Sequence, residues 1–229
     1  MSKYKLLIFD MGGTIVKPVL LNKCLNMTFL TDCINESLTY EQIDTITNFF
    51  NRLRNEIHAN HDRKFEISIK NLLEITINRF NLTPRKTLDE IEQLVVFGNT
   101  NFYQPDESDK LLDYVIQSAT QICVLSNSEV SSQLLLQILD KLYPLVNFSK
   151  VYSSADLMYR KPSTEMLKKI LEDFNLIPEE CCIIGNGEED IMVANSFGMN
   201  CFLVGDKKIS KDLKYNSILN LNDLLQYIK

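Results

Sequence analysis

The sequence lacks the features of several classes of protein. Its 229 residues contain no apolar run of the ~18 residues that a membrane-spanning helix needs. MSKYKLLIFD turns charged again directly after Leu6–Phe9, and no small-residue cleavage site follows, so we expect no signal peptide. There is no basic excess either. The net charge of −6 argues against a nucleic-acid or anionic-membrane partner.

Metal-binding cysteine patterns are also missing. Six cysteines are present, but there is no CxxC pair and no Cys/His cluster, so we expect no zinc site. Four of the cysteines lie in or beside apolar runs, as in QICVLS, ECCIIG and NCFLV. We expect free thiols that behave as small buried hydrophobic residues, which fits a reducing, cytoplasmic location.

Short apolar runs alternate with segments of helical period. Each apolar run is followed by a polar or glycine loop, which is typical of buried parallel strands. The alternation predicts an α/β fold, a Rossmann-like doubly wound parallel sheet. The predicted strands are Leu6–Phe9, Ile122–Leu125, Cys181–Ile184 and Cys201–Val204, and the predicted helices are Ser108–Ser118, Glu129–Leu142, Ser163–Asn175 with Ser163 as N-cap, Glu189–Phe197 and Asn222–Ile228.

One long segment departs from this alternation. Glycine is nearly absent between residues 17 and 100, where Gly98 is the only one. A helical period runs through Leu25–Asn35, Tyr40–Asn60, Glu66–Phe80 and Leu88–Val96. We interpret this segment as an all-α cap inserted after the first strand. The predicted domains are a core of residues 1–16 and 101–229 and a helical cap of residues 17–100.

Four loops carry residues suited to catalysis. In open α/β sheets, catalytic groups lie at the carboxyl ends of the strands. Each loop alone has an ordinary explanation as a helix cap, a turn or a solvated charge. Their order along the chain is a carboxylate, a hydroxyl with an amide, a lysine and a second acidic loop, and this order indicates one site. The loops are Asp10–Thr14, Ser126–Ser128, Arg160–Pro162 and Gly185–Asp190.

These loops resemble the four motifs of the haloacid dehalogenase (HAD) superfamily. LLIFDMGGT, VLSN, RKP and GNGEED are similar to hhhhDxDGT, hhh[ST], a lysine often followed by proline, and GDxxxD. The resemblance covers essentially the whole chain, because the insertion lies where the helical-cap (C1) subclass places its cap. It implies a magnesium-dependent hydrolase, a phosphatase that acts on a small phosphorylated molecule. We expect it to be a monomer or a homodimer.

The matching residues have defined chemistry. A carboxylate such as Asp10 can attack phosphorus and form an aspartyl-phosphate. The phosphoryl oxygens then need donors and positive charge, and magnesium prefers oxygen ligands. The predicted catalytic residues are Asp10, Ser126 and Lys161, the predicted substrate or phosphate ligands are Gly13, Asn127, Arg54 and His58, and the predicted metal ligands are Asp10, the carbonyl of Gly12, Asn186 and Asp190.

Two positions depart from the superfamily pattern. Gly12 stands where its phosphatases have an aspartate that protonates the leaving group and later activates water. General acid–base catalysis contributes about 10²–10⁴-fold, so we expect activity that is weakened or restricted to good leaving groups. Asn186 replaces a metal-binding aspartate, and we expect weak magnesium affinity. Whether Glu188 or Glu189 replaces the lost ligand stays open.

Two further hypotheses compete with a phosphatase. Gly12 and Asn186 also fit a catalytically silent relative that binds a phosphorylated ligand or a protein partner. The LSN of the second motif is shared with haloacid-type dehalogenases, so a haloacid-type dehalogenase is the other hypothesis.

In the cap, the stretch from Arg52 to Lys64 contains both histidines and three arginines. It is either an anion-recognising lip over the site, with Arg54 and His58 on one helix face, or a solvated helix end.

Overall fold

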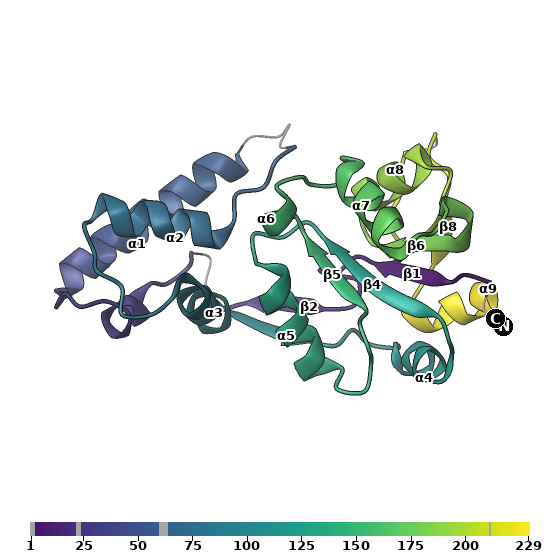
Figure 1. Cartoon of the computed structure of the whole chain (residues 1–229), viewed down its shortest axis with the longest axis horizontal. Helices are drawn as coiled ribbons and strands as arrows, with labels where there is room; N and C mark the ends of the chain where they lie inside the picture. The colour runs from purple at the N-terminus through teal and green to yellow at the C-terminus, as the bar shows by residue number, and fades with distance from the viewer. Residues whose placement is uncertain (1–2, 22–23, 60–63, 211) are drawn as a thin grey trace.

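Six parallel strands form the central sheet, in the order β5-β4-β1-β6-β7-β8 (Figure 1). The structure is a computed structural model that describes residues 3–21, 24–59, 64–210 and 212–229. The chain runs outward from β1 through β4 to β5 and returns to β6 on the other side of β1, so a topological switch point lies at the carboxyl end of β1. The strands are β1 (Leu6–Phe9), β4 (Gln121–Ser126), β5 (Lys150–Ser153), β6 (Cys181–Gly185), β7 (Asn200–Val204) and β8 (Asn216–Ile218).

Helices cover both faces of this sheet. Alternate side chains of β1 point to opposite faces: Leu7 and Phe9 pack against α4, α5 and the C-terminal α9, whereas Leu6 and Ile8 pack against α7 and α8 (Figure 1). Strands buried on both faces need apolar side chains at every position, and β1 is buried throughout. The core helices are α4 (Asp109–Gln117), α5 (Ser132–Leu142), α6 (Ser154–Leu157), α7 (Glu165–Phe174), α8 (Glu188–Ser196) and α9 (Leu225–Ile228), with 3₁₀ turns η2 (Pro178–Glu180) and η3 (Leu221–Leu224).

Three helices form a cap at one end of the elongated molecule (Figure 1). Each begins with a capping box, in which the N-cap side chain and the third helical residue satisfy each other's backbone N–H groups. The N-cap residues are Thr39, Ser68 and Thr87. The cap elements are α1 (Tyr40–His58), α2 (Ile69–Arg79), α3 (Leu88–Asn99) and the 3₁₀ turn η1 (Thr28–Asp32).

A two-stranded ribbon joins the cap to the core. β2 (Lys17–Leu20) pairs antiparallel with β3 (Thr100–Tyr103), so the chain leaves and re-enters the core side by side. The fold class, a doubly wound α/β core with an inserted helical cap, is therefore confirmed. The domain boundaries at residues 17 and 100 fall inside this ribbon and stay a prediction.

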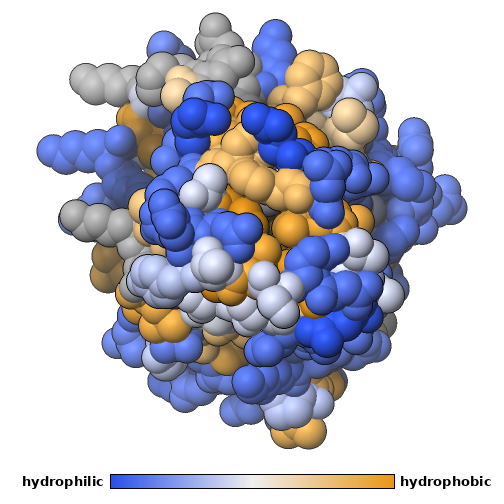
Figure 2. Space-filling model, turned by 90° about the vertical axis from the view of Figure 1, so that its left-hand side faces the viewer, coloured by the Kyte–Doolittle hydropathy of each residue, from blue (hydrophilic) through white to orange (hydrophobic). Residues whose placement is uncertain are grey.

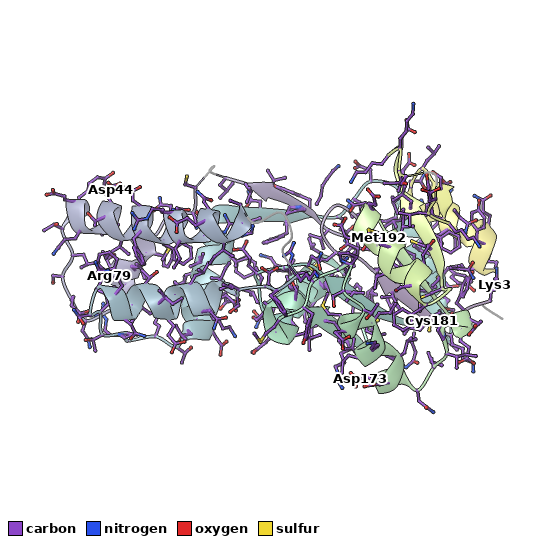
Figure 3. The ribbon with its side chains drawn as sticks, turned by 90° about the horizontal axis from the view of Figure 1, so that it is seen from above. Lys3, Asp44, Arg79, Asp173, Cys181 and Met192 are labelled. Carbon is purple, nitrogen blue, oxygen red and sulfur yellow. The ribbon has the colours of Figure 1, made fainter. Side chains whose placement is uncertain are left out.

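Figure 3 shows the same elongation from above, with Asp44 and Arg79 at the far end of the cap and Lys3 and Cys181 toward the opposite end. Figure 2 views the molecule from the cap end, where apolar residues gather in a central hollow ringed by hydrophilic ones. A cavity of about 290 Å³ on the cap is lined by Leu38, Ile46, Phe80 and Leu82, together with three polar residues of α1. None of the described helices is long and apolar enough to cross a membrane.

The predicted elements agree best where burial is complete. All four predicted strands form, each within one residue of its predicted ends, and five of the six free cysteines are buried, Cys24 being exposed. The predicted helix over Leu25–Asn35 is largely wrong, because only η1 forms there. The backbone N–H groups of Leu25 and Asn26 donate instead to the side chains of Asn51 and Asn99, at 2.9 and 2.7 Å. Asn60, the predicted end of the first cap helix, lies outside the described residues.

Other predicted helices form with later starts. The predicted helix at Glu129 begins at Ser132, because the N–H groups of Ser131 and Ser132 donate to the carboxylates of Glu92 and Asp156. α7 begins at Glu165 with Thr164 as N-cap, so the predicted cap at Ser163 is wrong by one residue. Strands β2, β3, β5 and β8 were not predicted.

Buried carboxylates hold the cap against the core. Arg54 of α1 donates two hydrogen bonds, each of 2.7 Å, to Glu129 in the loop after β4, and His58 Nε2 lies 3.2 Å from the same carboxylate. Glu92 of α3 accepts from the N–H and the hydroxyl of Ser131, at 2.9 and 2.6 Å. Burial alone would raise the pKa of Glu129, but hydrogen bonds from His58 and Arg54 lower it to about 2.

The first prediction concerns this contact. Glu129→Gln should lower the free energy of unfolding at pH 7 by about 1–3 kcal/mol, because Arg54 loses its carboxylate partner. The folded pKa of Glu129, about 2, lies below its ordinary 4.5. The stabilisation is therefore complete above the ordinary value and is lost as the pH falls toward 2. Urea unfolding should show the gap between the two proteins narrowing below about pH 4.5.

The matched control removes an exposed ion pair. Lys17 and Asp106 also join two segments, 3.0 Å apart, but their side chains are 57% and 88% exposed. Asp106→Asn should leave the unfolding curve unchanged, because water screens such pairs. A Glu129→Gln effect of equal size at every pH would contradict the assignment of the stabilisation to this ion pair.

Candidate active site

Asp10 lies at the switch point of the sheet, directly after β1. Its N–H donates to the carbonyl of Ile184 at 2.8 Å, which continues the pairing with β6 by one residue. One carboxylate oxygen accepts from the Thr14 hydroxyl at 3.0 Å, and the other accepts from Lys161 Nζ at 2.6 Å. The side chain is therefore fixed in place, with only a small part of its surface open to solvent.

Lys161 joins three of the four loops. Its ammonium donates to Asp10 Oδ1 at 2.6 Å, to Asp190 Oδ1 at 2.5 Å and to the carbonyl of Leu125 in β4 at 3.0 Å. An ammonium has three N–H donors, and each finds an acceptor here. The Lys161 side chain is only 2% exposed, and a charge buried this far requires such pairing.

Asn127 sets the backbone from which Lys161 extends. Its side-chain oxygen accepts from the Lys161 N–H at 2.7 Å, and its amide nitrogen donates to the Lys161 carbonyl at 3.0 Å. The peptide bond between Lys161 and Pro162 is cis. The loop after β4 thereby supplies both Ser126 at the strand end and the residue that positions the lysine.

Asp190 reaches the lysine from the first turn of α8. Its second oxygen accepts from the N–H of Gly187 at 3.0 Å, as an acidic residue at a helix start commonly does. Gly185 makes this approach possible, because a Cβ at that position would overlap the Asp190 carboxyl group. β6 therefore ends in a glycine for a steric reason.

The two glycines after Asp10 differ in what surrounds them. Gly13 has φ of +79°, and a Cβ there would overlap the side-chain amide of Asn186. This places Asn186 directly over Gly13. Gly12 is different, because its φ is not in the left-handed region and no atom lies within 4 Å of where a Cβ would be. Packing does not require a glycine at position 12.

These loops line one cavity of about 310 Å³. Asp10, Gly12, Ser126, Asn127 and Asn186 contribute to its wall, and so does Glu189. Glu188, the neighbouring glutamate, is exposed and is not among the lining residues. The structure thus brings together residues from all four predicted loops at the carboxyl ends of β1, β4 and β6.

Burial and charge act in opposite directions on the two central groups. Burial and the nearby charge of Asp190 raise the pKa of Asp10 to about 6, although the charge and hydrogen bond of Lys161 act to lower it. Burial would lower the pKa of Lys161, but the charges of Asp10 and Asp190 outweigh it and raise that pKa. At neutral pH the lysine is therefore charged and Asp10 is mostly ionised, the state that a nucleophile requires.

Arg54 and His58 contact Glu129 rather than Asp10. Of the predicted Arg52–Lys64 stretch, residues 60–63 lie outside the described part of the chain, so His61 is not placed. Arg52 is exposed and lies 3.9 Å from Glu56 on its own helix. A direct contact of Arg54 or His58 with substrate stays a prediction.

Three contacts at or beside the site were not predicted from the sequence. Thr14 belongs to the quoted motif, yet its hydrogen bond to Asp10 was not predicted. Arg160, next to Lys161, pairs with Glu66, which also accepts from the Ser154 hydroxyl at 3.0 Å. Glu66 is fully buried just before α2, where helical period gives no sign that a charge is turned inward. Arg160, next to Lys161, was the only feature of the sequence that could have indicated a buried acidic partner such as Glu66.

The cavity offers the oxygen ligands that magnesium prefers, but it offers less negative charge than a usual magnesium site. Magnesium takes oxygen ligands and keeps several waters. Asp10, Gly12 and Asn186 line the same cavity, and they carry a carboxylate, a backbone carbonyl and a side-chain amide oxygen, respectively. Asp190 is already bonded to Lys161 and Gly187. Within the described residues, no three Asp, Glu, His or Cys side chains cluster as metal ligands. Such a site would carry less negative charge than a pair of aspartates supplies.

The fold and the loops together define a class, a capped Rossmann-like hydrolase with a carboxylate–lysine–carboxylate centre at the strand ends. The chain belongs to the family of haloacid dehalogenase-like hydrolases, whose sequence pattern matches residues 7–204.

Solved structures of this kind share the fold over nearly the whole chain. A HAD phosphatase from Thermococcus onnurineus is 18% identical, with 97% of each chain covered and a TM-score of 0.60. A Bacillus subtilis protein described as a HAD hydrolase bound to magnesium is 18% identical, with 98% of each chain covered and a TM-score of 0.56. A structure named as a dehalogenase with an intermediate complex is 16% identical, covers 99% of this chain and 98% of its own, and has a TM-score of 0.56.

The second prediction tests the packing of the centre. Gly185→Ala should lower the free energy of unfolding by about 1–3 kcal/mol, because the added Cβ overlaps Asp190 and forces it away from Lys161. Gly98→Ala is the matched control. Gly98 lies in helix α3 with no atom within 4 Å of an added Cβ, so this change should stabilise the protein slightly. Equal thermal shifts for the two variants would contradict the close packing at Gly185.

Proposed function

We propose that this protein is a phosphatase that acts on a small phosphorylated molecule through an aspartyl-phosphate on Asp10, and that it is restricted to good leaving groups. One observation carries the proposal. The Asp10 carboxylate lies in the cavity wall, fixed by Thr14 and paired with the buried Lys161. A buried cation beside a carboxylate nucleophile can stabilise the negative charge of a transferring phosphoryl group.

The residues of the chain divide the work. Asp10 attacks phosphorus and later releases phosphate, so that one difficult hydrolysis becomes two easier steps. The Ser126 hydroxyl and the backbone N–H groups beside Asp10 and Asn127 donate to phosphoryl oxygens. Lys161 supplies charge, while Asn127 and Asp190 hold the lysine in position. In this proposal Gly13 leaves room for the phosphoryl group and for Asn186 together.

A weakly held magnesium ion belongs to the proposal. Asp10, the Gly12 carbonyl and Asn186 would hold it, with Glu189 as the additional acidic residue on the cavity wall. When bound, the ion supplies positive charge to the phosphoryl oxygens. Asp190 acts on it indirectly, through Lys161. Of the two glutamates in this loop, Glu189 is the better candidate to replace the lost aspartate, because it lines the cavity and Glu188 does not.

Gly12 sets the limit on the leaving group. Without a carboxyl side chain there, the residues described around Asp10 offer no acid in the usual position to protonate an alkoxide. Alkyl phosphates therefore react slowly, because their alkoxide leaving group needs a proton. Acyl phosphates and phosphoanhydrides do not need this proton, because their leaving groups, a carboxylate and a phosphate, are stable anions. Arg54 and His58 stay proposed substrate ligands, although their contact with Glu129 favours a role in holding the cap.

The second candidate function is a silent binding protein, and the same two positions favour it. Gly12 and Asn186 remove an acid and a charged metal ligand from one site. A haloacid dehalogenase is a third candidate, because cleavage of a carbon–halogen bond also needs no proton for the leaving group.

The third prediction tests the proposal directly. The protein, incubated with magnesium and acetyl phosphate, should form an aspartyl-phosphate on Asp10 that mass and peptide analysis of acid-quenched protein locates. Beryllofluoride should form a non-covalent adduct on the same carboxylate, which fluorine NMR of the native protein detects. Asp10→Asn should form none. Turnover of acetyl phosphate supports the phosphatase, and an adduct without turnover indicates that the water-activating step is lost. The absence of an adduct would overturn the proposal in favour of the binding protein.

The fourth prediction restores the missing acid. Gly12→Asp should raise the rate of alkyl phosphate hydrolysis by about 10²–10⁴-fold, the usual contribution of a general acid–base group. The open space around position 12 lets the new side chain fit without strain. Gly12→Asn has nearly the same shape but no acid, and should give no increase. If phosphate release is the same for both variants, the general acid is not what limits this site.

A further inference from the structure

The active-site cavity is lined by a polar and an apolar set of residues. Asp10, Ser126 and Asn127 lie at the strand termini and belong to the polar set. The apolar set comes from the ribbon, from the residue before it, from the loop that enters α5 and from α5 itself, and we call it the apolar wall. It consists of Val16, Pro18, Phe102, Val130 and Leu135.

These apolar residues are held by the fold. The N–H of Val16 donates to the carbonyl of Met11 at 2.9 Å, within the turn that carries Gly12 and Gly13. Phe102 lies opposite Pro18 in the ribbon and packs edge-to-face on Phe97 of the cap. The ribbon therefore presents an apolar surface to the strand ends, at a fixed place relative to Asp10.

Besides Asp10, two charged side chains line the cavity, those of Arg160 and Glu189. Arg160 lines the cavity, but its guanidinium donates to Glu66, whose side chain is fully buried. Glu189 extends from α8, beside Asn186. Ser128 also lines the cavity, and its hydroxyl oxygen accepts from the N–H of Val130 at 3.1 Å. The five residues of the apolar wall themselves carry no charge and no hydroxyl for a sugar or a second carboxylate.

We propose that the substrate is an acyl phosphate with a small apolar acyl chain, which lies against this wall while the phosphoryl group lies at Asp10. The proposal rests on the proposed function and adds the identity of the leaving group. Gly12 requires a group that departs without a proton, and the apolar wall requires one that is hydrophobic. A short-chain or aromatic carboxylate satisfies both conditions.

The reaction balances without an enzymic acid. An Asp10 oxygen forms a bond to phosphorus as the bond from phosphorus to the acyl oxygen breaks, and the acyl group leaves with that electron pair as a carboxylate. Water then attacks the phosphorus of the aspartyl-phosphate. The Asp10 carboxylate is regenerated, and one proton of the water goes to the phosphate and the other to solvent. The sum is acyl phosphate plus water giving a carboxylate, inorganic phosphate and a proton.

The size of the cavity limits the chain. Its volume of about 310 Å³ is at the lower end of the ~300–1,000 Å³ range of small-molecule sites. The phosphoryl group takes part of this space. We therefore expect an acyl chain no larger than that of butyryl or benzoyl phosphate.

The test compares acyl phosphates with the same leaving chemistry. Acetyl, butyryl and succinyl phosphate all release a carboxylate, but succinyl phosphate carries a second charge at the end of a chain as long as that of butyryl phosphate. Burial of a methylene contributes roughly fourfold, so kcat/KM for butyryl phosphate should exceed that for acetyl phosphate by about 15-fold. Succinyl phosphate should be no better than acetyl phosphate. Asp10→Asn protein supplies the background of spontaneous hydrolysis.

A pair of variants assigns the preference to the wall. Val130→Thr keeps the shape of the side chain but adds a hydroxyl to the wall, and should reduce the butyryl-to-acetyl ratio several-fold. Val19→Thr makes the same exchange at an exposed ribbon position that does not line the cavity, and should leave the ratio unchanged. Beryllofluoride has no acyl chain, so its adduct on Asp10 shows that each variant is folded.

The outcomes separate this inference from the proposed function. Turnover of all three substrates at similar rates, or a preference for succinyl phosphate, would overturn the apolar acyl chain and leave the phosphatase standing. Failure of all three substrates, with no adduct on Asp10, would overturn both. A butyryl preference that survives Val130→Thr unchanged would also count against the wall as its source.

Discussion

The site depends on one buried ammonium group shared by two carboxylates. Lys161 bonds to Asp10, Asp190 and the carbonyl of Leu125 from a nearly inaccessible position. Two carboxylates this close would repel each other without it, and an unpaired lysine would not stay buried. The three strands that meet here are therefore tied together by a single charge. The same arrangement keeps Asp10 ionised and in place at neutral pH.

Two steric conditions make this arrangement possible, and the cap adds a third, electrostatic one. Gly185 admits Asp190 and Gly13 admits Asn186, so each glycine is required by a side chain that lies over it. On the cap side, Glu129 follows the loop of Ser126 and Asn127, and it is held by Arg54. The loop that positions Lys161 is thus fixed both from the core and from the cap. Asn127, which bonds to Lys161, and Glu129, which bonds to Arg54, are only two residues apart. A change in the contact between Arg54 and Glu129 therefore acts on the segment that positions Lys161.

The sequence was sufficient for the features that depend on local pattern. Fully buried strands such as β1 and β6 are continuous apolar runs, and their loops contain the residues of the site in order. It failed where the deciding contact is remote. Leu25 and Asn26 lose their helix to the side chains of Asn51 and Asn99, which no local pattern encodes. All residues of β2 are exposed, so its sequence shows no alternation of apolar and polar residues from which a strand could be predicted. The pairing of Glu66 with Arg160 joins residues far apart in the chain, and only the fold brings them together.

The empty space beside Gly12 has an evolutionary consequence. No neighbouring atom would obstruct a side chain there, so the fold exerts no selection for glycine at this position. Glycine and aspartate codons can differ by a single base. Under the proposed function, one base change at this codon therefore separates a site with a general acid from a site without one, and the packing around position 12 accepts either residue. In the function that we propose, the residue at position 12 therefore sets which leaving groups the site accepts, while the contacts that hold the site together lie at Gly13 and Gly185.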